Sequence, residues 1–490
     1  METADSLALP ISLIFKKSLE EGCIPDDWKR ASVTPIFKKG SRSSANNYRP
    51  VSLTSVVCKT MESILREKVM THLLTNKLIS EQQHGFTPGR SCITQLLDSL
   101  DYWTEVLDRG GSVDIVYMDF RKAFDSVPHR RLMQKVEAHG IKGKIHKWIQ
   151  DFLTDRTQQV TVNGVTSSEA SVTSGIPQGS VLGPLLFVMY INDLPHHVQN
   201  ESRIFADDTK LFKEVKDGSK GKKEETKTPA ELDERITCPL QDDLDRLYDW
   251  SNDWLLTFHP EKCCKMRLGR STADSTLTMQ GKDTDGTTRR HELTSSEAEK
   301  DLGVLIDQKL SFKNHIAQAT AKANRTLGVI RRSFDHLTDH SFVQLYKSLV
   351  RPMLEYGQSV WQPSLKTLCQ DLEDVQRRAT RMIGRLKGKP YPERLATLKL
   401  PSLEHRRRRG DMIELYKYQT GLYNTSRPVF RPHSGRETRG HCKKLAKNSN
   451  NTRIRSDFFS QRVITAWNEL PEQVVTAPSL NSFKSRFDAH

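Results

Sequence analysis

The chain has 490 residues and a formal net charge of +15, from 75 Lys and Arg residues against 60 Asp and Glu residues. This length allows two or three domains with cores of their own, and the basic surplus favours a polyanionic partner, nucleic acid before membrane. Its eight cysteines form no C-x-x-C pair and have no histidine at finger spacing, which argues against a zinc knuckle.

The sequence also argues against secretion and membrane insertion. Glu2 and Asp5 stand where a signal peptide needs positive charge. The longest apolar stretch, 181–191, contains Gly183 and Pro184 and is too short to cross a bilayer. Because scattered cysteines favour reduced thiols, we expect an intracellular protein of the nucleus and/or the cytoplasm.

Residues 7–110 have mainly the pattern of helices, after a short helical lead-in. The stretch LTSVVCKTMESILREKVMTHLL (53–74) has apolar residues at helical spacing and basic residues on other faces. Two polar stretches are predicted loops: KKGSRSSANNYRP (38–50) and HGFTPGRSC (84–92).

The middle of the chain alternates strands and helices. VDIVYMDF (113–120) is a predicted strand, and a helical stretch follows at roughly 129–153. Asn163-Gly164 between two β-rich runs predicts a hairpin turn. SVLGPLLFVMYINDL (180–194) is a predicted apolar helix that follows a Gly/Pro-rich loop.

RIFADDTKLF (203–212) places Asp207 and Asp208 between two short apolar runs. Side chains alternate faces along a strand, so we expect a hairpin that turns around the pair and presents both carboxylates at one end.

The second half of the chain is more basic. Residues 214–230 are charged and nearly free of large apolar groups, which predicts a surface insertion or a flexible loop. Helix returns at 240–258, and a stretch of low hydrophobicity at 270–298 is expected to join two parts of the protein. From about residue 310 the chain is mostly helical.

Three acidic residues form the main candidate site. Asp119 lies at the end of the predicted strand, so antiparallel pairing in one sheet would bring it to Asp207 and Asp208. Such carboxylates repel one another unless cations lie among them, and Mg²⁺ prefers carboxylates together with substrate phosphates. Two such ions would suit an in-line phosphoryl transfer. The alternative is that one acid caps a turn while the others face water.

The loop before the apolar helix is a second candidate. Gly175, Pro177, Gln178 and Gly179 form a tight turn, in which glycines let the backbone approach a nucleotide and the following helix start favours anions. A plain turn is the alternative.

Five sequence blocks occur in the same order as in reverse transcriptases. They are YRPVSL (48–53), HGFTPGRSC (84–92), YMDFRKAFDSVPH (117–129), SGIPQGSVLGPLLF (174–187) and FADDTKLF (205–212). In detail the chain resembles the enzymes of non-LTR (LINE-type) retrotransposons, especially jockey-like elements, and VTPIFKKGSRSSANNYRPVSL (33–53) and EKDLGVLIDQKLSF (299–312) extend the resemblance to both sides. Five ordered blocks are far more specific than one.

The resemblance implies an α+β right-hand polymerase, with fingers, a palm that carries a small antiparallel sheet, and a thumb, followed by a basic, mostly helical C-terminal region. The expected parts are a lead-in (1–30), fingers and palm (31–285), a thumb-like helical region (286–370) and the C-terminal region (371–490).

The resemblance also implies roles for residues at matching positions. Asp119, the backbone carbonyl of Phe120, Asp207 and Asp208 would hold two Mg²⁺ ions, or Mn²⁺ in their place. Phe124 would act as a steric gate against a ribose 2′-hydroxyl, although a core phenylalanine is the alternative. Asp125 is expected to be a structural hydrogen-bonding residue.

Four further positions carry family roles in the cleft. Gln178 and Gly179 resemble the loop that packs on the template and the incoming base. Arg90 would reach nucleotide or template phosphates, with an unpartnered surface arginine as the alternative. Lys262 would approach the leaving pyrophosphate, and His259 stands where the family commonly has Asn.

Downstream, the stretch 315–334 has an apolar stripe (Ile316, Ala323, Leu327, Ile330) and a basic face (Lys322, Arg325, Arg332). A helix that grips duplex phosphates has this pattern, and so does an ordinary bundle helix. HRRRRGD (405–411) could hold RNA, act as a nuclear import signal or be a disordered charge run. Five large aromatic residues are expected in the core: Trp361, Tyr416, Tyr418, Tyr423 and Trp467.

The function implied by the resemblance is RNA-directed DNA synthesis, a nucleotidyl transfer from dNTPs to a DNA primer on an RNA template. One alternative is an inactive, retrotransposon-derived nucleic-acid-binding protein, and another is an RNA-maturation factor like the intron maturases. No endonuclease-like region is recognised, so endonuclease activity would have to come from elsewhere. The oligomeric state and the copied RNA stay open.

Overall fold

The computed structural model describes residues 4–215, 239–270, 276–282, 287–433 and 440–490. The predicted insertion at 214–230 lies outside these ranges from residue 216 onward. None of the helices within them is both long and apolar enough to span a bilayer.

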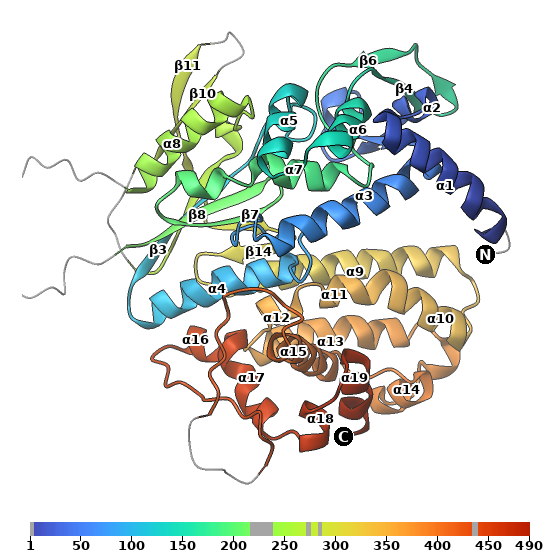
Figure 1. The fold of residues 1–490 in the computed structure, drawn as a ribbon. Coiled ribbons are helices and arrows are strands. Elements are labelled where there is room, and N and C mark those ends of the chain that lie inside the picture. Colours follow the sequence, from blue (N-terminus) through green and yellow to red (C-terminus); the bar gives the residue numbers. More distant parts are fainter. Residues whose placement is uncertain (1–3, 216–238, 271–275, 283–286, 434–439) are drawn as a thin grey trace, which may run out of the picture.

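A five-stranded sheet lies at the centre of the fold, in the order β12-β9-β3-β8-β7 (Figure 1). Its strands have these bounds: β3 Ser112–Met118, β7 Glu201–Phe205, β8 Asp208–Val215, β9 Cys264–Leu268 and β12 Thr294–Ser295. Strand β3 pairs antiparallel with both β8 and β9, and β7 and β8 form a hairpin in which Phe205 faces Asp208. The predicted strand at 113–120 and the predicted hairpin around Asp207 are therefore confirmed.

Both faces of this sheet are buried, and each belongs to a different hydrophobic cluster. Val113 and Ile115 of β3 pack into a cluster that includes helix α4 (Cys92–Asp108) and the C-terminal helices. Val116 and Met118 point to the other face and pack with helices of the N-terminal half. The alternation of a strand thus joins the two halves of the chain through one sheet.

A second sheet, in the order β2-β1-β4-β5 with β6 beside β4, takes two strands from residues 7–110, a stretch that is otherwise mainly helical, as predicted. Its strands are β1 Arg30–Phe37, β2 Tyr48–Leu53, β4 Arg156–Val162, β5 Val165–Thr166 and β6 Ala170–Val172. Strand β1 pairs antiparallel with β2 and parallel with β4, a partner more than 100 residues later. Pairing at that distance leaves no local signal, and the β-branched Val33, Thr34 and Ile36 were the available hint.

The helices of the first half largely follow the sequence pattern. They are α1 Ala4–Glu21, α2 Asp26–Lys29, α3 Val56–Thr75, α4 Cys92–Asp108, α5 His129–Ala138, α6 Gly143–Leu153 and α7 Gly183–Ile191. The helical stretch predicted at roughly 129–153 consists of two helices, which are separated at Gly140, where φ is 81°. The hairpin at Asn163-Gly164 is confirmed, with Val162 opposite Val165.

The stretch 270–298 is folded where it is described, rather than being a plain connection. Strands β10 (Thr278–Lys282) and β11 (Thr288–Glu292) form a hairpin against helix α8 (Pro239–Trp254). Leu277, Met279 and Leu293 are buried there, so a few well-placed apolar residues offset a polar average. Helix α8 also ends earlier than predicted, because Leu255 has a left-handed φ of 51°.

The C-terminal region is helical, as predicted. It follows the hairpin β13 (Ala298–Asp301) and β14 (Val304–Asp307), and its elements are α9 Lys313–Ser333, α10 Asp339–Leu345, a π-helical turn at Tyr346–Val350, α11 Arg351–Glu355, α12 Gln358–Trp361, α13 Lys366–Thr380, α14 Tyr391–Leu398, α15 Leu403–Gln419, α16 Arg453–Asp457, α17 Phe459–Asn468, α18 Glu472–Val475 and α19 Leu480–Ala489. Trp361, Tyr416 and Trp467 are buried core residues, and Tyr418 and Tyr423 are half-buried and pack on each other.

Helix α4 connects the C-terminal region to the central sheet through a buried charge. The carboxylate of Asp101, on α4, is almost fully buried and accepts hydrogen bonds from Arg455 (2.8 Å) and Ser460 (2.7 Å). Arg427 lies 3.4 Å from the same carboxylate. Residues from the last fifth of the chain thus neutralise an acid in its first quarter.

Candidate active site

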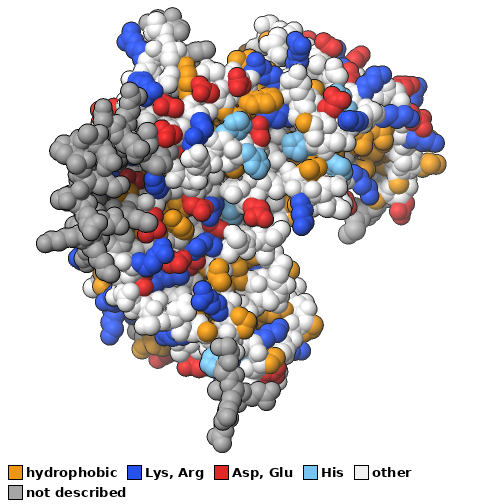
Figure 2. Space-filling model, turned by 60° about the vertical axis from the view of Figure 1, so that its left-hand side comes forward, with side chains coloured by type: hydrophobic (Ala, Val, Ile, Leu, Met, Phe, Trp, Pro, Cys, Tyr) orange, Lys and Arg blue, Asp and Glu red, His pale blue; other side chains and the backbone are white. Residues whose placement is uncertain are grey.

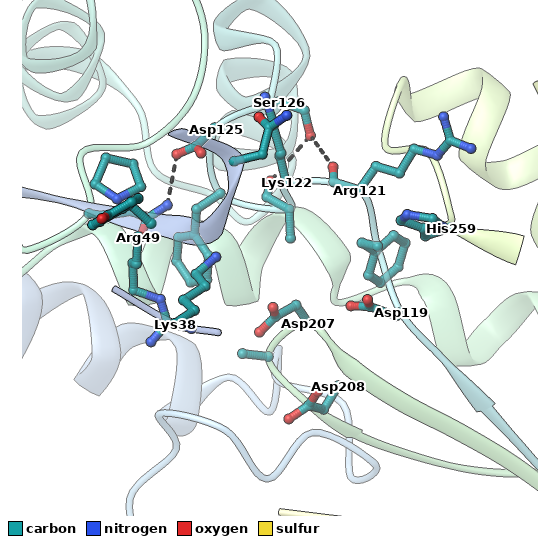
Figure 3. A pocket seen from close by; sticks show the side chains of 18 of the residues that line it. Lys38, Arg49, Asp119, Arg121, Lys122, Asp125, Ser126, Asp207, Asp208 and His259 are labelled. Atoms are coloured by element: carbon teal, nitrogen blue, oxygen red, sulfur yellow. Dashed lines mark hydrogen bonds between the residues drawn. The ribbon is translucent and has the colours of Figure 1, made fainter. Parts of the chain in front are cut away.

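The three predicted aspartates lie at one edge of the central sheet (Figure 3). Asp119 follows the last residue of β3, and the pairing of Met118 with Thr209 brings it beside the β7–β8 turn. Ala206, with a left-handed φ of 54°, makes that turn, so Asp207 and Asp208 stand at its end. All three line one cleft.

The carboxylates repel one another. Burial raises the pKa of Asp207, and the charge of Asp119 raises it further. Burial on the protein side, together with the charges of Asp207, Asp301 and Asp119, raises the pKa of Asp208 to about 6. The fold therefore keeps several carboxylates close together although they repel one another, and this arrangement is typical of functional sites.

The donor set fits a divalent cation that is completed by substrate. Within the described ranges, no three acidic, histidine or cysteine side chains converge as a closed ligand group. Mg²⁺ is commonly bound by one or two carboxylates with phosphates and water supplying the other oxygens. Asp119, Asp207 and Asp208 offer hard oxygen ligands, and the raised pKa values of Asp207 and Asp208 show that repulsion between the carboxylates persists, which suits that mode of binding.

Lys262 is the immediate cationic neighbour of the aspartates. It ends a 3₁₀ turn at Pro260–Lys262, and its Nζ lies 3.0 Å from Oδ2 of Asp119. The backbone N–H of His259 donates to the carbonyl of Asp119 at 2.8 Å, and the Phe120 ring stacks on Phe258 with centroids 4.3 Å apart. The block containing Lys262 is therefore fixed directly against the end of β3.

His259 replaces the family's usual Asn without disturbing this backbone contact. Burial and nearby cations lower the pKa of His259, so the ring is neutral at pH 7. Its Nδ1 is buried and has no hydrogen-bond partner among the described residues.

The cleft encloses about 2420 Å³ and has walls from several parts of the chain. One wall comes from β1, β2 and the loop between them, and another from the β13–β14 turn and the end of α11. The molecular outline in Figure 2 is notched between the upper part and the C-terminal helices. A space this large suits a polymeric substrate better than a metabolite.

Among the basic residues that line the cleft and have no role assigned from the sequence, two act on Asp207. Lys38 and Arg49, at the ends of the β1–β2 connection, oppose the rise in the pKa of Asp207 through their positive charge. Figure 3 shows both side chains across the cleft from the aspartates. Both residues lie in the stretch 33–53, where several basic residues occur and sequence alone does not show which of them face the cleft.

The Gly/Pro loop packs against β2. The N–H of Ser52 donates to the carbonyl of Gln178 (2.7 Å), and Gln178 Nε2 donates to Asp125 Oδ1 (2.8 Å). Asp125 is thus a hydrogen-bonding residue in the structure, as expected. Gly179 has a φ of 112°, and a Cβ there would lie 2.6 Å from the Ser52 carbonyl, so only glycine fits.

The expected anion site at the start of the following helix is already filled. The backbone N–H groups of Val181 and Leu182 donate to Oε2 of Glu62, at 2.7 and 2.9 Å, and Glu62 is fully buried. The sequence interpretation was wrong on this point, because a carboxylate from helix α3 satisfies these amides.

Phe124 is half-buried on the cleft wall and stacks on Phe187 of α7, with ring centroids 4.4 Å apart. Its ring is therefore held firmly, and it borders the same cleft as the aspartates.

The structure does not bring Arg90 to the cleft. Its Nη1 donates to the carbonyls of Ser80, Glu81 and Gln83, and its Nε donates to the carbonyl of Asn424 at 2.8 Å. Arg90 is neither a cleft residue nor an unpartnered surface arginine. It connects the loop after α3 with the C-terminal region.

The basic run 405–411 is part of helix α15 and not a disordered run. Arg406 forms a bidentate pair with Glu355, Arg409 pairs with Asp488, and Arg407 is buried. Asp411 pairs with Arg462 at 2.9 and 3.0 Å. Three of its four arginines thus serve packing within the C-terminal region.

Helix α9 has the two faces that the sequence predicts. Its apolar stripe is buried, while Lys322, Arg325 and Arg332 are exposed. A contact with nucleic acid on this face stays a prediction.

Comparison with known proteins agrees with this geometry. The family described as "Reverse transcriptase (RNA-dependent DNA polymerase)" matches residues 36–318. The RNA-directed DNA polymerase from mobile element jockey of Drosophila melanogaster is 30% identical over 411 residues, which cover 80% of this chain and 42% of that protein. A probable RNA-directed DNA polymerase from transposon BS of the same species is 25% identical over 390 residues, or 76% of this chain and 40% of that protein.

The chain thus spans less than half the length of these curated relatives. Among solved structures, telomerase from Candida albicans in complex with a fragment of telomeric RNA is 11% identical, with a TM-score of 0.37 over 76% of this chain and 67% of that chain. A likeness at that level carries no argument here.

Proposed function

Because this chain belongs to the reverse transcriptase (RNA-dependent DNA polymerase) family, we propose that it is an RNA-directed DNA polymerase of the non-LTR retrotransposon type. It extends a DNA primer on an RNA template, with dNTPs as substrates. The observation that carries the proposal is that Asp119, Asp207 and Asp208, with raised pKa values for Asp207 and Asp208, line one cleft of about 2420 Å³.

In this proposal the structure is a right hand. The central sheet with α5, α7 and α8 is the palm, the sheet of β1, β2 and β4 with the neighbouring helices forms the fingers, and the helices from α9 onward form the thumb. The boundaries 1–30, 31–285, 286–370 and 371–490 remain proposals. The pairing of β10 with β11 crosses residue 285 and favours ending the palm after β12.

Asp119, the carbonyl of Phe120, Asp207 and Asp208 would hold two Mg²⁺ ions, or Mn²⁺. Divalent ions held there supply the charge that activates a primer 3′-hydroxyl and stabilises the departing pyrophosphate. Asp207 and Asp208 must lose their protons to bind them, and binding would lower both pKa values.

The cations around the aspartates serve the phosphates. Lys262, now paired with Asp119, is placed to leave that pair for the leaving pyrophosphate, where it would stabilise developing charge. Lys38 and Arg49 face the same space and would hold the triphosphate by charge. No such role is proposed for Arg90.

The remaining cleft residues would select and position the nucleotide. The Phe124 ring, held by Phe187, is the proposed steric gate that disfavours a 2′-hydroxyl. Gln178 and Gly179 would support the template base through their fixed contacts with β2.

An inactive nucleic-acid-binding protein is the second candidate. One observation favours it: the Lys262–Asp119 pair, which neutralises one of the three acids.

Primer extension separates the two functions. Purified protein is given an RNA template, an annealed DNA primer, dNTPs and Mg²⁺. We expect extension by the wild type and by the variant of an exposed aspartate, Asp335→Asn, and none by Asp207→Asn, which should still bind the template. Full activity in Asp207→Asn would refute the site, and a wild type that binds without extending would favour the inactive protein.

A further inference from the structure

Tyr356 lies where three distant parts of the chain meet at the cleft wall. It follows helix α11, and its hydroxyl donates to the backbone carbonyl of Leu302, in the β13–β14 turn, at 2.8 Å. The Cys92 side chain, at the start of α4, lies against the same hydroxyl. Tyr356, Leu302, Gly303 and Cys92 all line the cleft that contains the aspartates.

The β13–β14 turn needs outside support. It has two residues, Leu302 with a φ of 43° and Gly303 with a φ of 88°. Left-handed backbone suits Gly303 but is unfavourable for leucine. The Tyr356 ring covers the glycine so closely that a Cβ on Gly303 would lie 3.0 Å from it. The hydroxyl and the ring of Tyr356 thus hold both residues of the turn.

The turn lies directly beside the catalytic strand. Asp301, which precedes it, forms a buried ion pair with Lys210, two residues after Asp208 on β8. The charge of Asp301 is also felt by Asp208. A shift of this turn would therefore move the cleft wall nearest to Asp208.

Tyr356 is itself fixed from the side of the C-terminal helices. Its carbonyl accepts a hydrogen bond from Nε1 of the fully buried Trp361 at 2.6 Å, and its N–H donates to Pro352 at 3.1 Å. The residue is nevertheless 45% exposed. Because water could satisfy this hydroxyl, burial does not force its bond to Leu302.

We propose that Tyr356 is a positioning residue for the polymerase reaction: its hydroxyl holds the Leu302–Gly303 turn and so fixes the nucleic-acid strand that lies on this wall beside the aspartates. This inference rests on the proposed function. Tyr356 acts through the turn and takes no part in the chemical step.

The matched control is Tyr416, in the same helical region. Its hydroxyl also donates to a backbone carbonyl, that of Ala477 at 2.7 Å, but it lies outside the cleft. Tyr356→Phe and Tyr416→Phe therefore each remove one hydrogen bond from a hydroxyl to a backbone carbonyl, and only the first touches the turn. Because Tyr416 is buried, its loss should cost at least as much global stability, so it controls for a general effect on folding.

Two measurements are made on the full chain. Hydrogen exchange of the amides at 302–305 should accelerate about fivefold in Tyr356→Phe, the ratio expected for one ordinary hydrogen bond, and not in Tyr416→Phe. In primer extension, Tyr356→Phe should lower kcat/KM for primer–template about fivefold with KM for dNTP unchanged. Tyr356→Ala, which also removes the ring, should lower it roughly 100-fold.

Unchanged exchange at 302–305 in Tyr356→Phe would overturn the proposal whatever the activity. So would faster exchange with unchanged extension kinetics, or an equal loss of extension in Tyr416→Phe. If the wild type extends no primer, the polymerase proposal fails by itself. Tyr356 is then judged by exchange and by primer–template affinity, and equal affinity of Tyr356→Phe and the wild type would overturn its role.

Discussion

The pair Asp207–Asp208 and the run Arg406–Arg409 are both strings of like charge, and they differ in what surrounds them. The two aspartates face a third carboxylate, and burial and repulsion raise their pKa values. The arginines lie on a helix whose neighbours supply Glu355 and Asp488. The hydrogen bonds that Arg406 donates to Glu355 raise the pKa of Arg406, so its charged form is favoured.

The presence or absence of partners of opposite charge distinguishes side chains that are available to a ligand from side chains that stabilise the fold. Paired arginines hold helices together and leave little free charge for a partner. Unpaired aspartates weaken the folded state until a cation arrives, and such a cost is typical of sites that bind or react. A string of like charge in a sequence therefore says little about function until its partners are known.

The largest expected change in the free energy of unfolding concerns the paired charges of helix α15. Asp411→Ala leaves Arg462, which is mostly buried, without its bidentate partner. We expect a loss of about 3–5 kcal/mol in the free energy of unfolding, measured by denaturant titration.

The double variant Asp411→Leu/Arg462→Met provides the control, because replacing both partners by apolar groups is often nearly neutral. A loss below about 1 kcal/mol for Asp411→Ala alone would mean that the charges of this helix are not structural, and the contrast would fail.

A smaller change in stability is expected for the unpaired aspartates. With Mg²⁺ removed by a chelator, the folded protein holds the proton of Asp208 up to about pH 6, above the usual range of an Asp pKa. Folding therefore loses stability as the pH rises from about 4 to about 6. Asp208→Asn removes this loss and should be more stable than the wild type above pH 6, by up to about 1 kcal/mol because water screens the exposed side.

The difference should shrink as the pH falls towards 4, where the carboxyl is protonated in the folded chain and about half protonated in the unfolded chain, and it should vanish below about pH 3. Thermal unfolding from pH 4 to pH 8 measures the difference. A wild type that equals or exceeds Asp208→Asn at pH 8 would show that the aspartates are already neutralised without metal.

The smallest expected change in the free energy of unfolding distinguishes exposed from paired arginines within the run Arg406–Arg409. Arg408 is exposed, unlike its neighbours Arg406, Arg407 and Arg409. Arg408→Ala should change the free energy of unfolding by less than about 0.5 kcal/mol, whereas Arg406→Ala should cost more, since it leaves Glu355 half of its contacts. Equal effects of the two substitutions on unfolding would argue that exposure does not distinguish them.

Local chemistry made much of the fold predictable. The β7–β8 hairpin, the turn at Asn163-Gly164, the strand at 113–120 and the helices of the C-terminal region all follow from short patterns. The meeting of Asp119 with Asp207 could be expected because strand ends in one sheet lie together. The aromatic residues expected in the core are mostly there.

Contacts between distant segments were not predictable in this way. No short sequence pattern predicts that β1 pairs with β4, that Glu62 accepts hydrogen bonds from the loop before α7, or that Arg90 donates to the carbonyl of Asn424. Each depends on a partner far along the chain, and a polar or basic residue looks the same in sequence whether it meets that partner or water. The β10–β11 hairpin was missed because three buried residues support it within a polar stretch.

The buried carboxylate of Asp101 has a consequence for how this protein is made. Its hydrogen-bonding neighbours Arg455 and Ser460 are more than 350 positions further along, outside the segment 36–318 that the family match covers. During synthesis, the carboxylate of Asp101 on α4 gains these hydrogen bonds only after residue 460 has been made. In a recombinant fragment of residues 36–318, the carboxylate of Asp101 would lack these two hydrogen-bond donors, although its helix packs against the central sheet. Any shortened version should therefore keep the chain through residue 460.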